Sequence, residues 1–482
     1  MDLTRTIICY KVSALTIMKH IVLASVFGVF AISCNAQSNL EWVSTTQSAV
    51  WKKNEIQTQA VNATPDVEIY LNNKFQTISG FGTCFNEKGW ESLNLLSNKD
   101  KNLIFKELFS PGDGANFTIC RMPLAANDFS LNWYSYNETE GDFEMKNFSI
   151  ANDEKTLIPF LKSAIKYNNE LKLWASPWSP PSWMKYNKHY AMKKSKYNDL
   201  KTGQEGTEDA DMFIQEEAYF KAYTLYFEKF VKAYRKKGIN ISMVMPQNEF
   251  VAAQVFPSCA WTVEGLGKFI SYLGPQMKAL DVDVFFGTMN SANDKFVDTI
   301  MQNKEVSKYI KGVGLQWAGK DAMATLNKRY PTLPLYQTEQ ECGDGKNDWK
   351  YAVYTWSLMK QYLSNGAEAY MYWNTSLKEG GISTWGWKQN SLITVDTLTK
   401  TYKYNYEYYL IKHLSHYVKP GAKRIATEGK FDNLLAFINL DKSIAVVMFN
   451  ENDQPKQVVV KIGDKQIDPL LQPNSVNTFL IK

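Results

Sequence analysis

The sequence predicts an α/β protein, a (β/α)₈ TIM barrel with a small all-β sandwich domain attached. Three observations support this fold class. Eight short apolar segments alternate with stretches of helical periodicity, as in a barrel of strand–helix units. The helical periodicity disappears after about residue 419, where short β-type runs separated by turn residues follow. The chain of 482 residues is also long enough for more than one domain.

The barrel strands are expected where apolar, strand-favouring segments lie between the helical patterns. These segments are 78–85, 117–123, 171–177, 242–246, 282–287, 313–317, 335–339 and 369–374. The clearest helix is expected at 216–237, because aromatic and apolar residues recur there every three and four positions. Gly238 then ends this helix, since glycine is the commonest residue just past a helix C-terminus.

Two all-β segments flank the barrel, which we place at residues 76–418. Residues 419–482 are expected to form the β-sandwich, since several short strand-like runs in this segment are separated by turn residues. Residues 37–75 also look extended, and we expect their strands to join the same sandwich. A long polar loop at 186–211 follows the third barrel strand, which places it at the rim where barrel enzymes carry their sites.

The N-terminal residues 1–36 have the features of a signal segment. A short basic start at 18–20 precedes an apolar run at 21–32 that is too short to span a bilayer, and Met18 is an alternative start of translation. Two forms of processing stay open: cleavage after Ala36, or lipid modification of Cys34 in a lipoprotein-like box. Both predict export to the periplasm, medium or surface of a bacterium, with membrane contact only through a lipid at Cys34.

The composition argues against several classes of protein. A net charge of +5 without a dominant Lys/Arg cluster makes nucleic acid a poor partner. Only three histidines follow the signal segment, so neither a metal site nor a cofactor is expected. None of them lies at a predicted strand end, which argues against a Ser-His-Asp hydrolase. The 14 tryptophans include several at strand ends and in polar loops, where core packing does not explain them.

Two predicted strands end in a glutamate. The fourth strand is followed by Glu249 and the seventh ends in Glu339. Because the C-terminal ends of barrel strands meet at one rim, the two carboxylates are expected to face each other. Two facing carboxylates are the groups that cleave a glycosidic bond.

Other residues at the same rim suit a sugar-binding cleft, since indole rings stack on sugar C–H faces while carboxylates and amides bind hydroxyls. In the loop 384–389, Trp385 is expected to add a stacking wall. Arg121 is better explained as a buried ion partner that holds the glutamates in place, and Trp174 is better explained by packing. The remaining candidates for substrate contact are Asp128, Trp178, Asn248, Trp317, Trp373 and Asn374.

These segments resemble glycoside hydrolase family 30, the family of glucosylceramidases and β-1,6-glucanases, over most of the chain. The resemblance rests on Gly80-Phe81-Gly82, Arg121-Met122-Pro123-Leu124-Ala125, Asp128-Phe129-Ser130, Ala175-Ser176-Pro177-Trp178-Ser179-Pro180-Pro181-Ser182-Trp183-Met184-Lys185, Gln247-Asn248-Glu249, Thr338-Glu339 and Tyr372-Trp373-Asn374. It implies a retaining enzyme with a barrel and a β-sandwich, in which Glu249 is the general acid/base and Glu339 the nucleophile.

The resemblance also implies roles for the neighbouring side chains. Asn248 would bind the sugar 2-hydroxyl, and Asp128 and Trp178 would line the subsite of the non-reducing sugar. Trp373 and Asn374 would stand near the nucleophile.

Three features depart from the family pattern. Phe250 follows the acid/base glutamate where the family often has proline. The run 316–318 is Gln-Trp-Ala where His-Trp-Tyr is common, so the aromatic hydroxyl that would touch the nucleophile is missing or is supplied elsewhere. Glu341 is a rival nucleophile, because strand alternation would put it on the same face as Glu339.

The preferred function is therefore an exported retaining β-glycoside hydrolase that acts on β-1,6-linked glucan by double displacement. Within the same family, the alternatives are a glucosylceramidase-like enzyme or a β-glycosidase for xylan, a galactoside or a fucoside. The alternative of a different class is a non-catalytic glycan-binding protein.

Overall fold

The computed structural model describes residues 40–57, 59–112 and 114–482, which belong to one compact unit. The expected signal segment, with Cys34, lies outside the described residues. Within the described ranges, no helix combines the length and the apolar character needed to cross a membrane.

Eight parallel strands form a closed barrel, which confirms the predicted fold class. Each strand pairs with the next one along the chain, and the last pairs with the first. All eight expected segments overlap a barrel strand. The strands are β5 (Gly80–Cys84), β6 (Ile119–Pro123), β7 (Lys172–Ser176), β8 (Met243–Val244), β9 (Asp283–Met289), β10 (Ile310–Gln316), β11 (Leu335–Glu339) and β12 (Ala367–Asn374).

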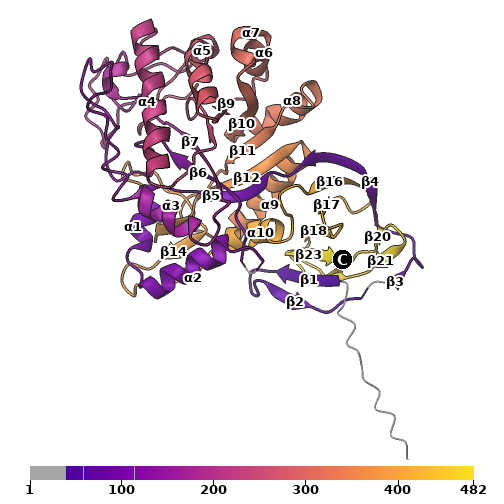
Figure 1. Ribbon diagram of the computed structural model, residues 1–482. Helices are drawn as coiled ribbons and strands as arrows, with labels where there is room; N and C mark the ends of the chain where they lie inside the picture. Colours follow the sequence, from indigo (N-terminus) through magenta and orange to yellow (C-terminus); the bar gives the residue numbers. More distant parts are fainter. Residues whose placement is uncertain (1–39, 58, 113) are drawn as a thin grey trace, which may run out of the picture. The chain divides into compact units, whose positions relative to one another are not determined.

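Helices follow the strands and form the outer layer of the barrel (Figure 1). The helix α4 (Glu217–Lys236) starts and ends within one residue of the expected helix and buries its aromatic face, as its periodicity requires. The other helices are α1 (Glu87–Leu93), α2 (Asn98–Phe109), α3 (Leu157–Ile165), η1 (Ser182–Met184), α5 (Val263–Ala279), α6 (Lys295–Gln302), α7 (Lys304–Ser307), η2 (Trp317–Ala322), α8 (Met323–Arg329), α9 (Trp349–Ser364) and α10 (Tyr406–Ser415).

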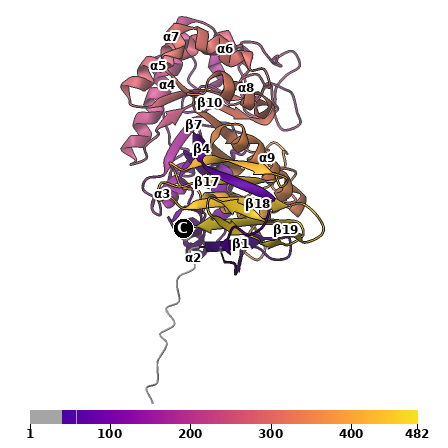
Figure 2. The same cartoon turned by 90° about the vertical axis from the view of Figure 1, so that its right-hand side faces the viewer.

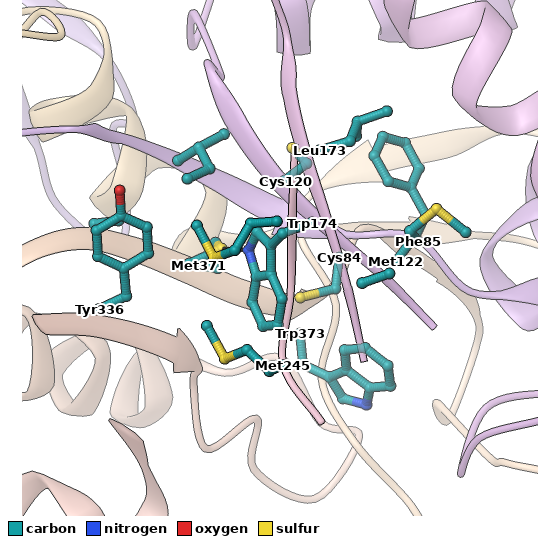
Figure 3. Packing of buried hydrophobic residues seen from close by; sticks show 14 of the residues in the cluster. Cys84, Phe85, Cys120, Met122, Leu173, Trp174, Met245, Tyr336, Met371 and Trp373 are labelled. Atoms are coloured by element: carbon teal, nitrogen blue, oxygen red, sulfur yellow. Dashed lines mark hydrogen bonds between the residues drawn. The ribbon is translucent and has the colours of Figure 1, made fainter. Parts of the chain in front are cut away.

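Large side chains fill the interior of the barrel (Figure 3). Trp174 from β7 is fully buried, and its indole N–H donates to the Sδ of Met371 from β12 at 2.9 Å. Met122 and Met245 pack in the same cluster. Trp174 therefore packs the core. The close packing of these side chains inside the barrel keeps the strand ends, which carry the site, in fixed positions.

The β-sandwich takes strands from both sides of the barrel in the sequence (Figure 2). Two early strands, β1 (Leu40–Thr45) and β4 (Val67–Thr77), pair with the late strands β23 (Ser475–Ile481) and β16 (Lys423–Gly429). The other strands of this ten-stranded sheet are β2 (Lys52–Asn54), β3 (Gln59–Ala60), β17 (Leu434–Ile438), β18 (Ile444–Asn450), β20 (Val460–Ile462) and β21 (Lys465–Ile467). A three-stranded sheet contains β13 (Ser376–Lys378), β14 (Ile393–Val395) and β15 (Tyr402–Tyr404). A two-stranded sheet contains β19 (Lys456–Gln457) and β22 (Leu470–Leu471).

The last helix of the barrel is bonded to the sandwich through His413. The ring nitrogens of this buried side chain lie 2.7 Å from the hydroxyl of Thr478 and 2.9 Å from that of Thr45. Burial, and next the charge of Lys412, lower the pKa of His413 to about 3, so the ring is neutral at ordinary pH. A neutral imidazole both donates and accepts, which suits two hydroxyl partners.

Candidate active site

The C-terminal ends of the barrel strands surround a pocket of about 240 Å³. Both glutamates that the sequence singled out face this pocket. The residues that line it are Asp128, Trp178, Asn248, Glu249, Gln254, Phe256, Asn290, Trp317, Glu339, Trp387 and Gln389. In the described part of the chain, no group of three or more His, Cys, Asp or Glu residues is arranged to hold a metal ion.

The carboxylate of Glu339, at the end of β11, accepts hydrogen bonds from three side chains. Arg121 from β6 forms a buried ion pair with it at 2.7 Å, and the Nε2 of Gln316 lies 3.2 Å from the same oxygen. The indole N–H of Trp317 donates to the other oxygen at 3.3 Å. Burial raises the pKa of Glu339 above its ordinary value, while the three donors lower it. Arg121 therefore lies in the ion-partner position expected from the sequence.

Glu249 has a different environment from Glu339. It follows β8, is half-buried, and its carboxyl accepts one side-chain hydrogen bond among the described residues, from Gln316 at 3.3 Å. Burial, and next the negative charge of Glu339, raise the pKa of Glu249 to about 8. Because Glu339 has an arginine and two further donors, it ionises before Glu249. At neutral pH the pair thus contains one carboxylic acid and one carboxylate, the states that acid catalysis and nucleophilic attack require.

The side-chain amide of Gln316 connects the two glutamates. Its oxygen accepts from the hydroxyl of Thr338 at 2.9 Å and from Arg121 at 3.3 Å, so its NH₂ group faces the carboxylates. Its nitrogen lies 3.3 Å from Glu249 and 3.2 Å from Glu339. The two bonded carboxyl oxygens are therefore separated by no more than the sum of these distances, about 6.5 Å.

Asn248 lies beside the glutamate pair, and its side-chain oxygen accepts three hydrogen bonds from the protein. That oxygen accepts from Arg121 at 2.6 Å, from the Thr288 hydroxyl at 3.1 Å and from Gln316 at 3.2 Å. The side-chain nitrogen makes no hydrogen bond within the described residues. This NH₂ group is therefore available as a donor to a ligand hydroxyl in the pocket.

Asp128 and Trp178 form an inner wall of the pocket. One oxygen of Asp128 accepts from the indole N–H of Trp373 at 3.1 Å, and the other is buried without a partner among the described residues. The rings of Trp178 and Trp373 stack at 5.1 Å, and the Arg121 guanidinium lies 4.4 Å from the Trp178 ring centre. The unpaired oxygen of Asp128 is a ready acceptor for a substrate hydroxyl.

Two residues expected to contact substrate are instead behind this wall, and we correct both. Trp373 is fully buried behind Trp178, and its indole N–H bonds to Asp128. Asn374 is also fully buried: its amide donates to Gln389 at 2.8 Å, and its oxygen accepts from Asn86 at 2.9 Å. Its hydrogen-bonding groups are therefore used within the protein.

Trp385 does not form the expected stacking wall either. Its ring lies 3.9 Å from that of Trp133, and its N–H donates to the backbone oxygen of Asn127 at 3.1 Å. Trp387, two residues later and 41% exposed, lines the pocket instead. Gly386 lies between them with a positive φ of 78°, so the loop turns there and sends the two indoles in different directions.

Several pocket residues were not candidates from the sequence. Asn290 directly follows β9, which is the same strand-end signal that identified Asn248 after β8. Phe256 lies in an irregular loop with no motif. Gln254 likewise had no pattern that set it apart from ordinary loop residues, and Gln389 lies in the loop 384–389, where Trp385 was the candidate.

Glu341 is not an alternative nucleophile in this structure. Its carboxylate pairs with Lys320 at 2.8 Å and accepts from the Tyr354 hydroxyl at 2.6 Å, and it does not line the pocket. Strand β11 ends at Glu339, so the alternation that would have aligned the two glutamates does not extend to Glu341.

Trp317 gives the carboxylate of Glu339 one of its donors, the indole N–H. Trp317 and Glu249 both have positive φ angles, 50° and 47°, which non-glycine residues rarely adopt. Such backbone conformations cost on the order of 1 kcal/mol each and cluster at functional sites, where they aim a side chain.

A TIM barrel with a paired carboxylic acid and carboxylate in its pocket, and tryptophans around them, is typical of a glycoside hydrolase. Residues 78–418 match the glycosyl hydrolase family 30 TIM-barrel domain, and residues 421–479 match the family's beta sandwich domain. The chain belongs to glycoside hydrolase family 30. It is thus an enzyme whose substrate is a β-linked carbohydrate.

Relatives with two different names match most of the chain. Putative glucosylceramidase 1 of Caenorhabditis elegans is 30% identical, covering 78% of this chain and 74% of the relative. The endo-1,6-β-D-glucanase of Neurospora crassa is 25% identical, over 84% of this chain and 85% of the relative. Among solved structures, the endo-β1,6-glucanase BT3312 is 25% identical with a TM-score of 0.79, covering 92% of this chain and 99% of that chain.

Proposed function

We propose that the protein is a retaining hydrolase of β-1,6-linked glucan. The Gln316 bridge carries the retaining part of this proposal, because it limits the two bonded carboxyl oxygens to a separation of about 6.5 Å. Retaining glycosidases have carboxyl groups roughly 5–5.5 Å apart, whereas inverting enzymes need roughly 6.5–9.5 Å to admit a water molecule. The bridge favours the shorter range.

The catalytic roles follow from the two environments. Glu339, ionised beside Arg121, attacks the anomeric carbon and forms a glycosyl-enzyme ester. Glu249 gives its proton to the glycosidic oxygen as the bond to the leaving group breaks. Deprotonated Glu249 then takes a proton from a water molecule, which attacks the anomeric carbon and frees Glu339.

The remaining polar groups hold the sugar during both steps. The free NH₂ group of Asn248 donates to the 2-hydroxyl, and the unpaired oxygen of Asp128 accepts from a hydroxyl of the same ring. Trp178 offers its face to the C–H surface of the sugar.

Two relatives named as endo-β-1,6-glucanases, each matched over more than four fifths of this chain, support a β-1,6-glucan substrate. The 30% identity to a putative glucosylceramidase favours glucosylceramide as the second candidate. The same active-site chemistry serves both, so the difference lies in the group on the leaving side of the bond.

The test is hydrolysis of β-1,6-glucan and of glucosylceramide by the wild type, by Glu339→Gln and by Glu341→Gln. We expect glucan hydrolysis with initial release of the β-anomer in an NMR time course, a loss of about 10⁴-fold or more in Glu339→Gln, and near-wild-type rates in Glu341→Gln. Initial release of the α-anomer would reject retention. Equal rates in all three proteins would reject the assignment of the nucleophile.

We also propose that the protein is exported through residues 1–36. Fractionation of expressing bacterial cells, with the wild type and with Cys34→Ser, tests this. If Cys34 is lipidated, the wild type is found with membranes and Cys34→Ser is not. If Ala36 precedes the cleavage site, both are released. Retention of both in the cytoplasm contradicts export.

A further inference from the structure

Asn290 lines the pocket with a side chain that makes no hydrogen bond among the described residues. It directly follows β9, and its side-chain oxygen is buried without a hydrogen-bond partner among the described residues. Of the residues that line the pocket, only Asp128 has another such oxygen. Buried polar atoms in proteins are nearly always paired, so each of these two acceptors indicates a ligand group that donates to it.

The two acceptors belong to different sides of the catalytic pair. Asp128 follows β6 and lies against the Trp178–Trp373 stack. Asn290 follows β9, which pairs with β8, the strand that leads to Glu249. In the proposed mechanism Glu249 protonates the leaving oxygen, so the leaving group lies on the Glu249 side. The position of Asn290 therefore suits a hydroxyl of the leaving group, and that of Asp128 a hydroxyl of the attacked sugar.

An aromatic corner stands beside the same part of the pocket. Phe256 and Trp387 both line the pocket, with ring centres 6.3 Å apart and planes at 66°. Trp387 is 41% exposed, so its ring is accessible to a ligand in the pocket. Two rings at such an angle offer faces for the C–H surface of a pyranose, and the amide of Gln254 adds a polar group.

The long loop 186–211 supports both sides of this corner. The backbone N–H groups of Met192 and Lys193 donate to the carbonyl oxygen of Gln254, each at 2.9 Å. The Asn198 side chain donates to the carbonyl of Val255, directly before Phe256, at 2.9 Å. On the other side, Tyr197 packs so closely on Gly386 that an added Cβ would lie 2.3 Å from its ring. Because these contacts already fix the two rings, little conformational entropy is lost when a ligand binds to them.

We infer that Asn290, Phe256 and Trp387 form a subsite for the leaving group and that this group is a second sugar. The inference rests on the proposed glycosidase function. A ceramide would need a continuous apolar track beyond the glycosidic oxygen, whereas here amides alternate with the rings. The subsite makes Asn290 a specificity-determining residue: it accepts a hydroxyl of the leaving sugar and takes no part in the bond changes.

The test compares a leaving group that has sugar hydroxyls with one that has none. We would measure kcat/KM for p-nitrophenyl β-glucoside, for the four glucose disaccharides with β-1,2, β-1,3, β-1,4 and β-1,6 linkages, and for glucosylceramide. Asn290→Leu removes the acceptor and Asn290→Asp keeps one. Asn293→Leu, in the same connection but outside the pocket lining, is the control.

We expect Asn290→Leu to lower kcat/KM on the best disaccharide about 10- to 100-fold while changing the aryl glucoside by no more than about twofold. Asn290→Asp should recover most of the loss, and Asn293→Leu should match the wild type on both substrates. Equal losses on the disaccharide and the aryl glucoside, or no loss on either, would overturn the subsite. So would wild-type turnover of glucosylceramide that exceeds that of every disaccharide. A wild type inactive on all glucosides would reject the proposed function itself.

Discussion

Replacing Trp317 with phenylalanine should move the acid limb of the pH–activity profile and leave the alkaline limb in place. The indole N–H donates to the carboxylate of Glu339, and this bond favours the ionised form of Glu339. Phenylalanine keeps the ring but has no donor. The pKa of Glu339 therefore rises in the variant, and the nucleophile stays protonated up to a higher pH.

The size of the shift can be worked from the hydrogen bond. At 3.3 Å the bond is longer than the roughly 2.7–2.9 Å of a strong charge-assisted bond. It should therefore contribute near the lower end of the ~1.5–3 kcal/mol expected for a hydrogen bond to a charged group. Since about 1.4 kcal/mol corresponds to one pKa unit, the acid limb should move up by about one unit.

The assay is kcat/KM on an aryl β-glucoside from about pH 3 to 10, because kcat/KM reports the titration of the free enzyme. Trp385→Phe is the matched control, since this indole donates to a backbone oxygen behind the pocket and not to a carboxylate. An acid limb that stays in place in Trp317→Phe, or that moves equally in Trp385→Phe, would refute the reasoning. A shift confined to the alkaline limb would show that the indole N–H acts on the pKa of Glu249 and not on that of Glu339.

Three further predictions follow from buried groups. The alkaline limb of the wild-type kcat/KM profile should have an apparent pKa of about 8, since burial and the charge of Glu339 keep Glu249 protonated up to that pH. An apparent pKa below about 6 for this limb would contradict the prediction. Asp153→Leu removes the acceptor of three tyrosine hydroxyls at 2.5–2.9 Å, so the free energy of unfolding should fall by about 3 kcal/mol and Tm by roughly 3 °C. The control is Glu154→Ala at the exposed neighbouring residue, which should lower Tm by under about 1 °C. Equal Tm values in the two variants would contradict this prediction. Lys185→Met removes the donor to the carbonyls of Tyr190 and Ser258 and to the Ser179 hydroxyl. Since Ser179 directly follows Trp178 and Ser258 is two residues after Phe256, the pocket wall should loosen and KM for a β-glucan oligosaccharide should rise about tenfold. Unchanged KM and Tm would contradict this prediction.

The barrel was predictable because its strands carry a local signal. Each expected segment is short, apolar and bounded by helical patterns, and every one overlaps a strand of the closed barrel. Strand limits were less certain. Only Met243–Val244 pair as a strand in β8, because the chain turns into the loop with Glu249 soon afterwards.

The candidate site was predictable only in part. Carboxylates and amides directly after strands are visible in a sequence, so Glu249, Glu339 and Asn248 were found. Which face of a loop points inward is not visible, and the choice of Trp385 over Trp387 was wrong for that reason. Asn374 follows the same strand-end rule, but its partners come from distant segments that only the folded chain brings together.

The pairing of β1 with β23 has a consequence for how the chain acquires its structure. Trp42 on β1 donates to Asn477 on β23, 435 residues away in the sequence. During synthesis β1 therefore lacks this neighbour until the whole barrel and nearly all of the sandwich have been made. Such long-range pairings slow folding and leave strand edges exposed to aggregation. The sandwich is consequently the last part to close, and losing 475–481 would leave two strands, β1 and β18, without their common neighbour.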